Sequence, residues 1–135
     1  MKIYFSCSIT GGRTDQPMYS AMVDWMLARG HNVLTAHIAK PNVMAAETVV
    51  DAVTVYRRDI EWIDEADVVV AEVSTPSHGV GYEIAYAVTK NKPVLCLARE
   101  GVKVSKMITG NDRVRFERYR DENDAIKMIG DFLKR

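Results

Sequence analysis

The stretch VVVAEVSTPSHGVGYEIAYA, residues 68–87, passes from one secondary-structure pattern to another. Its first part belongs to the segment Asp67–Val73, which is apolar enough to predict a strand buried on both faces. After the loop Ser74–His78, the segment Gly79–Lys90 predicts a helix. A buried strand that leads directly into a helix is typical of α/β proteins, whose parallel sheets are covered by helices.

Strands and helices alternate along the rest of the chain as well. Four further strands are predicted at Ile3–Ser8, Asn32–Ala36, Pro93–Ala98 and Arg113–Tyr119, the last at an edge of the sheet. Further helices are predicted from Asp15 to Gly30, from Val50 to about Glu65 and after Asp121, with a short turn or helix at Val102–Ile108 and irregular chain from His37 to about Val49. This alternation predicts a single α/β domain, residues 1–135, with a doubly wound parallel sheet in the order 2-1-3-4-5 and helices on both faces.

Composition and charge narrow the class of protein. Of the 135 residues, 47% are hydrophobic and 27% charged, and 18 Lys and Arg balance 18 Asp and Glu. A net charge of zero disfavours a nucleic-acid polymer as partner, whereas a nucleotide needs only a local pocket. No apolar run approaches the ~20 residues of a membrane span, and the N-terminal residues enter a strand without a signal-peptide pattern. Cys7, Cys96 and three scattered histidines show no metal-site spacing, so we expect a cytoplasmic protein with reduced cysteines, no metal and no cofactor.

Two glycine-bearing loops should face each other at one end of this sheet. In the order 2-1-3-4-5 the strand order reverses between strands one and three, and ligands bind there beyond the carboxyl ends of the strands. The loop 6–13, SCSITGGR, follows strand one and offers hydroxyls and backbone N–H groups to an anion, although an ordinary turn explains it equally well. The loop after strand three carries Ser77, Gly79 and Gly81 at a helix N-terminus, which can receive a phosphate.

Two acids could do chemistry in this crevice. Glu83 is predicted on the first turn of its helix, where the helix dipole should favour the ionised carboxylate, and an ionised carboxylate can act as a nucleophile. A glutamate on a solvated helix face is an equally simple interpretation. Asp59 lies beside Ile60 at the edge of the apolar face of its helix, where it either reaches the crevice or pairs with a neighbouring arginine.

Four segments carry a resemblance to a known family. They are Tyr4-Phe5-x-x-Ser8-Ile9-x-Gly11-Gly12-Arg13, Asp59-Ile60-x-Trp62, Ala66-Asp67-Val68-Val69-Val70-Ala71-Glu72-Val73 and Pro76-Ser77-x-Gly79-Val80-Gly81-Tyr82-Glu83. In this order, over nearly the whole chain, they resemble the 2′-deoxynucleoside 5′-phosphate N-hydrolases, which belong to the nucleoside 2-deoxyribosyltransferase family. The resemblance implies a flavodoxin-like fold, a dimer, and cleavage of the bond between base and deoxyribose in a deoxynucleoside monophosphate.

The resemblance also implies roles for single residues. Glu83 matches the family nucleophile, Asp59 the second acid, and Tyr4 a tyrosine that bonds the catalytic groups. The positions that match substrate-binding residues are Ser8, Ser77 and Gly79 for the phosphate, Ile9 and His37 for base and sugar, and Ser105, near Met107, from a neighbouring subunit. Attack by Glu83 would give a 5-phospho-deoxyribosyl enzyme, from which water releases deoxyribose 5-phosphate.

The glycine loop departs from the family pattern at one position. Thr10 stands where many relatives have an arginine before the paired glycines, so a phosphate-binding cation is missing there. Gly11 is retained and Arg13 remains nearby, and we expect both, with Thr10, to contact the substrate. The segment from His37 to Val49 is where selectivity for the base could differ.

Two other functions stay open. A deoxyribosyltransferase moves deoxyribose between free bases, and such enzymes usually have an aspartate where this chain has Ser77, because they bind a free 5′-hydroxyl. A catalytically silent nucleotide-binding module is the alternative from another class. The joint presence of Glu83, Asp59 and Tyr4 argues against a silent module, and Ser77 with Ser105 favours the hydrolase over the transferase.

The segment Gly101–Ile108 predicts a shared active site. A small domain has few walls to enclose a nucleotide, and two-fold symmetry allows the same segment of each chain to cover the pocket of the other. Val104, Met107 and Ile108 would supply apolar surface, and Ser105 a donor for the phosphate. An amphipathic turn packed on its own domain is the simpler alternative. We expect a homodimer with shared sites.

Overall fold

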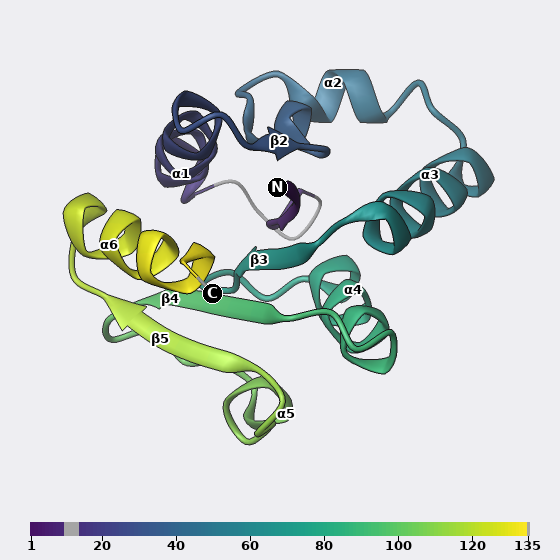
Figure 1. Cartoon of the computed structure of the whole chain (residues 1–135). Helices are drawn as coiled ribbons and strands as arrows, with labels where there is room; N and C mark the ends of the chain where they lie inside the picture. Colours follow the sequence, from purple (N-terminus) through teal and green to yellow (C-terminus); the bar gives the residue numbers. More distant parts are fainter. Residues whose placement is uncertain (10–13, 135) are drawn as a thin grey trace.

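The computed structural model describes residues 1–9 and 14–134, so the predictions for Thr10, Gly11 and Arg13 lie outside the described residues. Its five strands form one parallel sheet in the order β2-β1-β3-β4-β5, which confirms the predicted order (Figure 1). The strands are β1 (Lys2–Ser6), β2 (Asn32–Val33), β3 (Val68–Glu72), β4 (Val94–Arg99) and β5 (Arg115–Tyr119).

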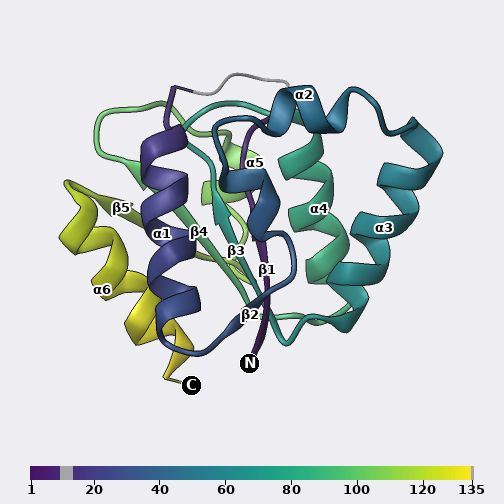
Figure 2. The ribbon, with the colours of Figure 1, turned by 90° about the horizontal axis from the view of Figure 1, so that it is seen from above.

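Helices cover both faces of the sheet, as predicted. They are α1 (Gln16–Ala28), the 3-10 helix η1 (Ala36–Ala39), α2 (Val43–Glu47), α3 (Ala52–Glu65), α4 (His78–Thr89), α5 (Lys106–Thr109) and α6 (Glu122–Leu133). Figure 2 shows α1 and α6 on one side of the sheet and α3 and α4 on the other. Among the described residues, no helix is long and apolar enough to cross a membrane.

The alternation of side chains along each strand divides the core into two clusters. Ile3 and Phe5 of β1 point to one face, where they pack with α1 and α6. Tyr4, between them, points to the other face and packs with Ile63 of α3 and Ile84 of α4. Because β3 and β4 alternate in the same way, each face is lined by every second residue of the three central strands.

The second strand is shorter than predicted. We expected Asn32–Ala36, but β2 ends at Val33 and the chain turns into η1. The reason lies in Thr35, whose Oγ1 accepts from the backbone N–H of Phe5 at 2.9 Å and donates to the Phe5 carbonyl at 2.6 Å. One side chain thereby satisfies the two backbone groups that a longer strand would have paired with.

The segment 37–49 is more regular than predicted, because it contains the end of η1 and the whole of α2. The next helix, α3, begins after Asp51 rather than at Val50. Asp51 is its N-cap and accepts from the backbone N–H of Thr54 at 2.8 Å. Together, η1 and α2 cover the carboxyl end of β1, next to α3 and α4 (Figure 2).

Candidate active site

A cavity of about 650 Å³ lies where β1, α2, α3 and α4 meet. Its lining includes both predicted acids, Asp59 from α3 and Glu83 from α4. It also includes Ile9, Ser77 and Gly79, so the structure brings together five residues that the sequence analysis placed in one site. The cavity opens at the carboxyl end of the sheet, where a doubly wound fold binds its ligands.

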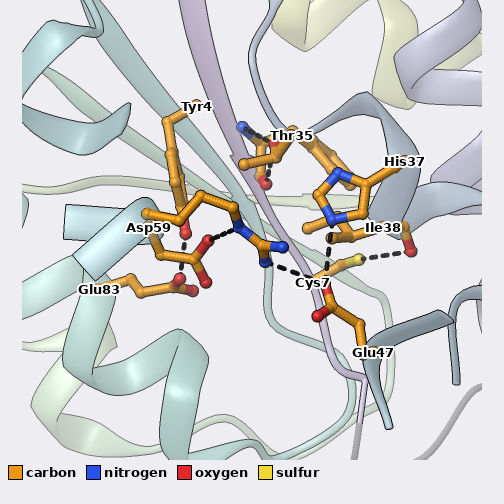
Figure 3. A network of polar contacts seen from close by, with 10 residues as sticks. Tyr4, Cys7, Thr35, His37, Ile38, Glu47, Asp59 and Glu83 are labelled. Carbon is orange, nitrogen blue, oxygen red and sulfur yellow. Dashed lines mark hydrogen bonds and ion pairs between the residues drawn. The ribbon is translucent and has the colours of Figure 1, made fainter. Parts of the chain in front are cut away.

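Glu83 is held by two hydroxyls from β1. Tyr4 Oη donates to Glu83 Oε2, as Figure 3 shows, and Ser6 Oγ donates to Oε1 at 2.8 Å. Tyr4 and Ser6 are two residues apart on one strand and therefore point to the same face. The sequence analysis missed Ser6, although its spacing from Tyr4 carried that signal. With both oxygens engaged, the carboxylate of Glu83 has one fixed orientation.

The environment of Glu83 contradicts one prediction. Because α4 begins at His78, Glu83 lies on the second turn of the helix and not on the first, where the helix dipole would have favoured ionisation. Burial raises the pKa of Glu83 to about 7, although the hydrogen bonds from Tyr4 and Ser6 act in the opposite direction. Near neutral pH this carboxyl can therefore both hold and release a proton.

Asp59 combines the two alternatives that its sequence position left open. It lines the cavity, and its Oδ1 accepts from Arg58 Nε at 2.9 Å. Burial raises the pKa of Asp59, while Arg58 lowers it, and the balance leaves the pKa above its ordinary value. Asp59 and Glu83 thus have raised pKa values in the same cavity, which is typical of catalytic acids and bases.

A charged cluster that the sequence analysis did not find lies beside Asp59. Arg58 Nη2 donates to Glu47 Oε1 at 2.9 Å, and His37 Nε2 lies 2.9 Å from the same oxygen (Figure 3 shows His37 and Glu47). The guanidinium of Arg58 also lies over the ring of Trp62, 4.9 Å from its centroid. Glu47 lines the cavity, so His37, one of the predicted substrate-binding residues, contacts a wall of the site through Glu47.

The remaining predicted residues lie elsewhere. Ser8 is fully buried after the end of β1. Ser105 caps α5, where its Oγ accepts from the backbone N–H of Met107 at 3.2 Å, and Met107 is 85% exposed. Both line a second groove of about 650 Å³ that shares Ser77 and Tyr82 with the first cavity. Within the described part of one chain, Ser105 and Met107 therefore lie next to the Glu83 cavity but not in its lining.

No metal site is apparent within residues 1–9 and 14–134, since no group of three His, Cys, Asp or Glu side chains is arranged to hold an ion. Cys7 lines the cavity, and the side chains of Cys7 and Cys96 are both buried.

Comparison with known proteins identifies the family. The family model described as nucleoside 2-deoxyribosyltransferase matches residues 3–122. The chain belongs to this family. Human 5-hydroxymethyl-dUMP N-hydrolase is a relative with 41% identity over 134 residues, which cover 96% of this chain and 76% of that protein. A Methanococcoides burtonii protein, provisionally named 2′-deoxynucleoside 5′-phosphate N-hydrolase 1, is 38% identical over 111 residues, or 82% of this chain and 91% of that one.

A solved structure with low sequence identity supports the fold of this family member. The structure of the CMP N-glycosidase of Clostridium botulinum matches with a TM-score of 0.70 at 16% identity, over 96% of this chain and 99% of that chain. At this identity the match concerns the arrangement of strands and helices alone. The family and the fold that the four sequence segments implied are both confirmed.

Proposed function

We propose that this protein hydrolyses the N-glycosidic bond of 2′-deoxynucleoside 5′-monophosphates and releases free base and 2-deoxyribose 5-phosphate. The observation that carries the proposal is the pair of acids, Glu83 and Asp59, with raised pKa values in one cavity. Most enzymes that cleave glycosidic bonds use two carboxyl groups, one on either side of the glycosidic carbon. The names of the relatives support the same reaction class.

In the proposed reaction, Glu83 is the nucleophile. One of its oxygens forms a bond to C1′ of the sugar while the C1′–N bond breaks and the electron pair leaves with the base. Asp59 hydrogen-bonds or protonates the leaving base, because a base anion is a poor leaving group. Water then attacks C1′, and the bond to Glu83 breaks. Tyr4 and Ser6 hold the carboxylate in line throughout.

The 5′-phosphate is expected at the start of α4. Ser77 caps this helix, and its Oγ accepts from the backbone N–H of Val80 at 3.4 Å, a long and therefore easily exchanged contact. Helix N-termini bind phosphate through backbone N–H groups. Glu83 lies further along α4 than Ser77, so the two anionic groups are separated. Phosphate binding would then position C1′ against Glu83.

We also propose a homodimer in which Ser105 of the neighbouring subunit completes the site. Three large apolar or aromatic side chains near the cavity and the second groove are exposed: Tyr56 by 53%, Tyr82 by 56% and Met107 by 85%. The rings of Tyr56 and Tyr82 pack edge to face across α3 and α4 at 6.2 Å. An exposed aromatic pair beside an exposed methionine is typical of a surface that another chain covers.

The test measures base release from each deoxynucleoside monophosphate, and exchange of deoxyribose between free bases. The hydrolase releases base from the monophosphates and shows no exchange, whereas a transferase would show exchange. Glu83→Gln should abolish release while nucleotide binding remains. Glu61→Gln is the matched control, because Glu61 is exposed on α3 and lies outside the site. Normal kcat in Glu83→Gln would reject the proposed nucleophile.

A further inference from the structure

Ser6 contacts the carboxyl group of Glu83 from behind the wall of the cavity. Its Oγ donates to Glu83 Oε1 at 2.8 Å, while Tyr4 Oη donates to Oε2. Ser6 is the last residue of β1 and is 0% exposed, and the described lining of the cavity includes Glu83 but not Ser6. Ser6 can therefore influence a reaction in the cavity only through Glu83.

A hydrogen-bond donor to Glu83 has opposite effects on the two steps of the proposed reaction. The carboxylate is charged before it attacks C1′ and is part of a neutral ester afterwards, and a hydrogen bond to a charged acceptor is roughly twice as strong as one to a neutral acceptor. The bond from Ser6 therefore weakens during attack, which slows the first step. It strengthens as charge returns to the departing carboxylate, which speeds the second step.

The burial of Glu83 makes the second step the more demanding one for this carboxyl group. Burial raises the pKa of Glu83 to about 7, although the hydrogen bonds from Tyr4 and Ser6 act in the opposite direction. Burial thus destabilises the charged form to which the ester must return, and each donor restores part of that stability.

We propose that the hydroxyl of Ser6 speeds the release of the sugar from Glu83. The inference rests on the proposed function, because it needs a covalent bond between Glu83 and C1′. In this step the bond between Glu83 and C1′ breaks and its electron pair returns to the carboxylate. The oxygen of a water molecule bonds to C1′, and the proton of this water passes to the Asp59 carboxylate, which has protonated the base. Ser6 keeps its own proton throughout.

Single-turnover reactions of wild type and Ser6→Ala measure the two steps separately. With enzyme in excess over a deoxynucleoside monophosphate, release of base reports the attack, and release of deoxyribose 5-phosphate reports the departure of Glu83. The pH is set well above the pKa of Glu83, so that the carboxylate is ionised in both proteins.

In Ser6→Ala we expect base to appear at least as fast as in wild type, and deoxyribose 5-phosphate to appear about tenfold more slowly. Tyr4 still orients the carboxylate, and the space that the missing hydroxyl leaves is too small for a water molecule to take its place. Mass spectrometry of quenched samples should show Ser6→Ala with one 5-phospho-deoxyribosyl group attached.

Two further variants serve as a graded test and a control. Ser6→Cys keeps a weaker donor in nearly the same volume, so its rate of sugar release should lie between those of wild type and Ser6→Ala. Ser20→Ala should leave both rates unchanged, because Ser20 Oγ donates to the carbonyl of Ala39 at 2.8 Å and neither residue belongs to the described lining of the cavity.

Added methanol separates an effect on Glu83 from an effect on the attacking water. Water and methanol both displace the same carboxylate, so slower departure of Glu83 reduces both reactions equally. The ratio of methyl glycoside to deoxyribose 5-phosphate should therefore be the same in wild type and Ser6→Ala. A changed ratio would overturn the inference and would mean that Ser6 affects the position of the water.

The inference is also overturned if sugar phosphate does not lag behind base in Ser6→Ala, or if release of base slows as much as release of sugar phosphate. If wild type releases base and Glu83→Gln does not, the proposed function stands in either case. If wild type releases no base from any monophosphate, both fail. Circular dichroism establishes that each variant is folded, and Ser6→Cys carries the test if Ser6→Ala is not.

Discussion

At the scale of single residues, Glu83 sets the pH dependence. A nucleophilic carboxylate must be ionised, and burial holds the pKa of Glu83 at about 7 against the lowering effect of Tyr4 and Ser6. On the acid side of the profile, activity should therefore fall about tenfold per pH unit below this pH. In Tyr4→Phe the carboxylate of Glu83 loses a hydrogen-bond donor that favours its charged form, so the pKa of Glu83 rises. The acid limb of the pH–activity profile, where activity falls with falling pH, therefore moves to higher pH.

The measurement is kcat/KM against pH for wild type and Tyr4→Phe on one substrate. Ionisation of the substrate phosphate is common to both profiles, so the difference between them reports the enzyme group. Tyr86→Phe is the control, since the Tyr86 hydroxyl bonds Asp64 on the surface and should leave the limb in place. A limb that stays fixed, or moves to lower pH, in Tyr4→Phe would mean that Glu83 is not the titrating group.

The same scale shows which site residues the sequence could reveal. Glu83 and Asp59 were found from their local patterns and Tyr4 from the family resemblance; the structure places Glu83 and Asp59 in one cavity and the Tyr4 hydroxyl against Glu83. Ser6 was missed although it follows Tyr4 with strand spacing. Glu47 could not be found from its neighbours in sequence, because its place in the site depends on Arg58 of another helix. An ion pair between residues of two different helices produces no regular spacing in the sequence, so a single sequence does not reveal it.

At the scale of elements, the start of α4 should distinguish phosphate from hydroxyl. Ser77 is the N-cap of α4, and aspartate is as good an N-cap as serine, so Ser77→Asp should fold with unchanged stability. Its added negative charge should repel a 5′-phosphate at this helix end. We expect kcat/KM to fall on the order of 100-fold on monophosphates and much less on the matching nucleosides.

Thermal denaturation of Ser77→Asp provides the control for folding, and base release from dCMP and deoxycytidine provides the comparison. Equal losses on both substrates would argue against a phosphate at this position. Ser77→Ala is a useful companion, because it removes the cap without adding charge. It should cost stability, and its loss on monophosphates should be smaller than that of Ser77→Asp.

Element boundaries followed from sequence where the pattern is long and local. β3 and α4 fall close to their predicted limits, since a buried strand and a capped helix each have clear signals. β2 does not, because the hydroxyl of Thr35 replaces the ladder with Phe5 and the chain leaves the sheet early. The helical turns of η1 and α2 depend on packing over β1, which a local pattern does not contain.

At the scale of the whole molecule, the predicted sheet order is confirmed, whereas the homodimer stays a prediction. Right-handed crossovers between parallel strands leave few ways to order five strands, and the structure has the expected one. No comparable rule predicts which surface of the chain a second subunit would cover. One chain provides an exposed Met107, an exposed Tyr82 and a second groove that contains Ser105 next to the Glu83 cavity.

The last prediction is that each active site needs two chains. Glu83→Ala removes the nucleophile, and Ser105→Trp places a bulky side chain where the partner's pocket would be covered, so each variant alone should be inactive. In a mixed dimer, Glu83 of one chain and Ser105 of the other form one intact site. Mixing equal amounts should restore about a quarter of wild-type activity, because about half of the dimers are mixed and each has one of its two sites intact.

Sedimentation at the assay concentration establishes the oligomeric state, and a tag on one variant establishes that the chains exchange. Lys103→Trp is a control on the exposed part of the same segment. It tests whether any added bulk in this segment inactivates the enzyme or whether position 105 is special. A monomer that turns over substrate, or exchanged dimers without recovered activity, would show that the Glu83 cavity is complete within one chain. Ser105 would then act only as the N-cap of α5, where its Oγ accepts from the backbone N–H of Met107.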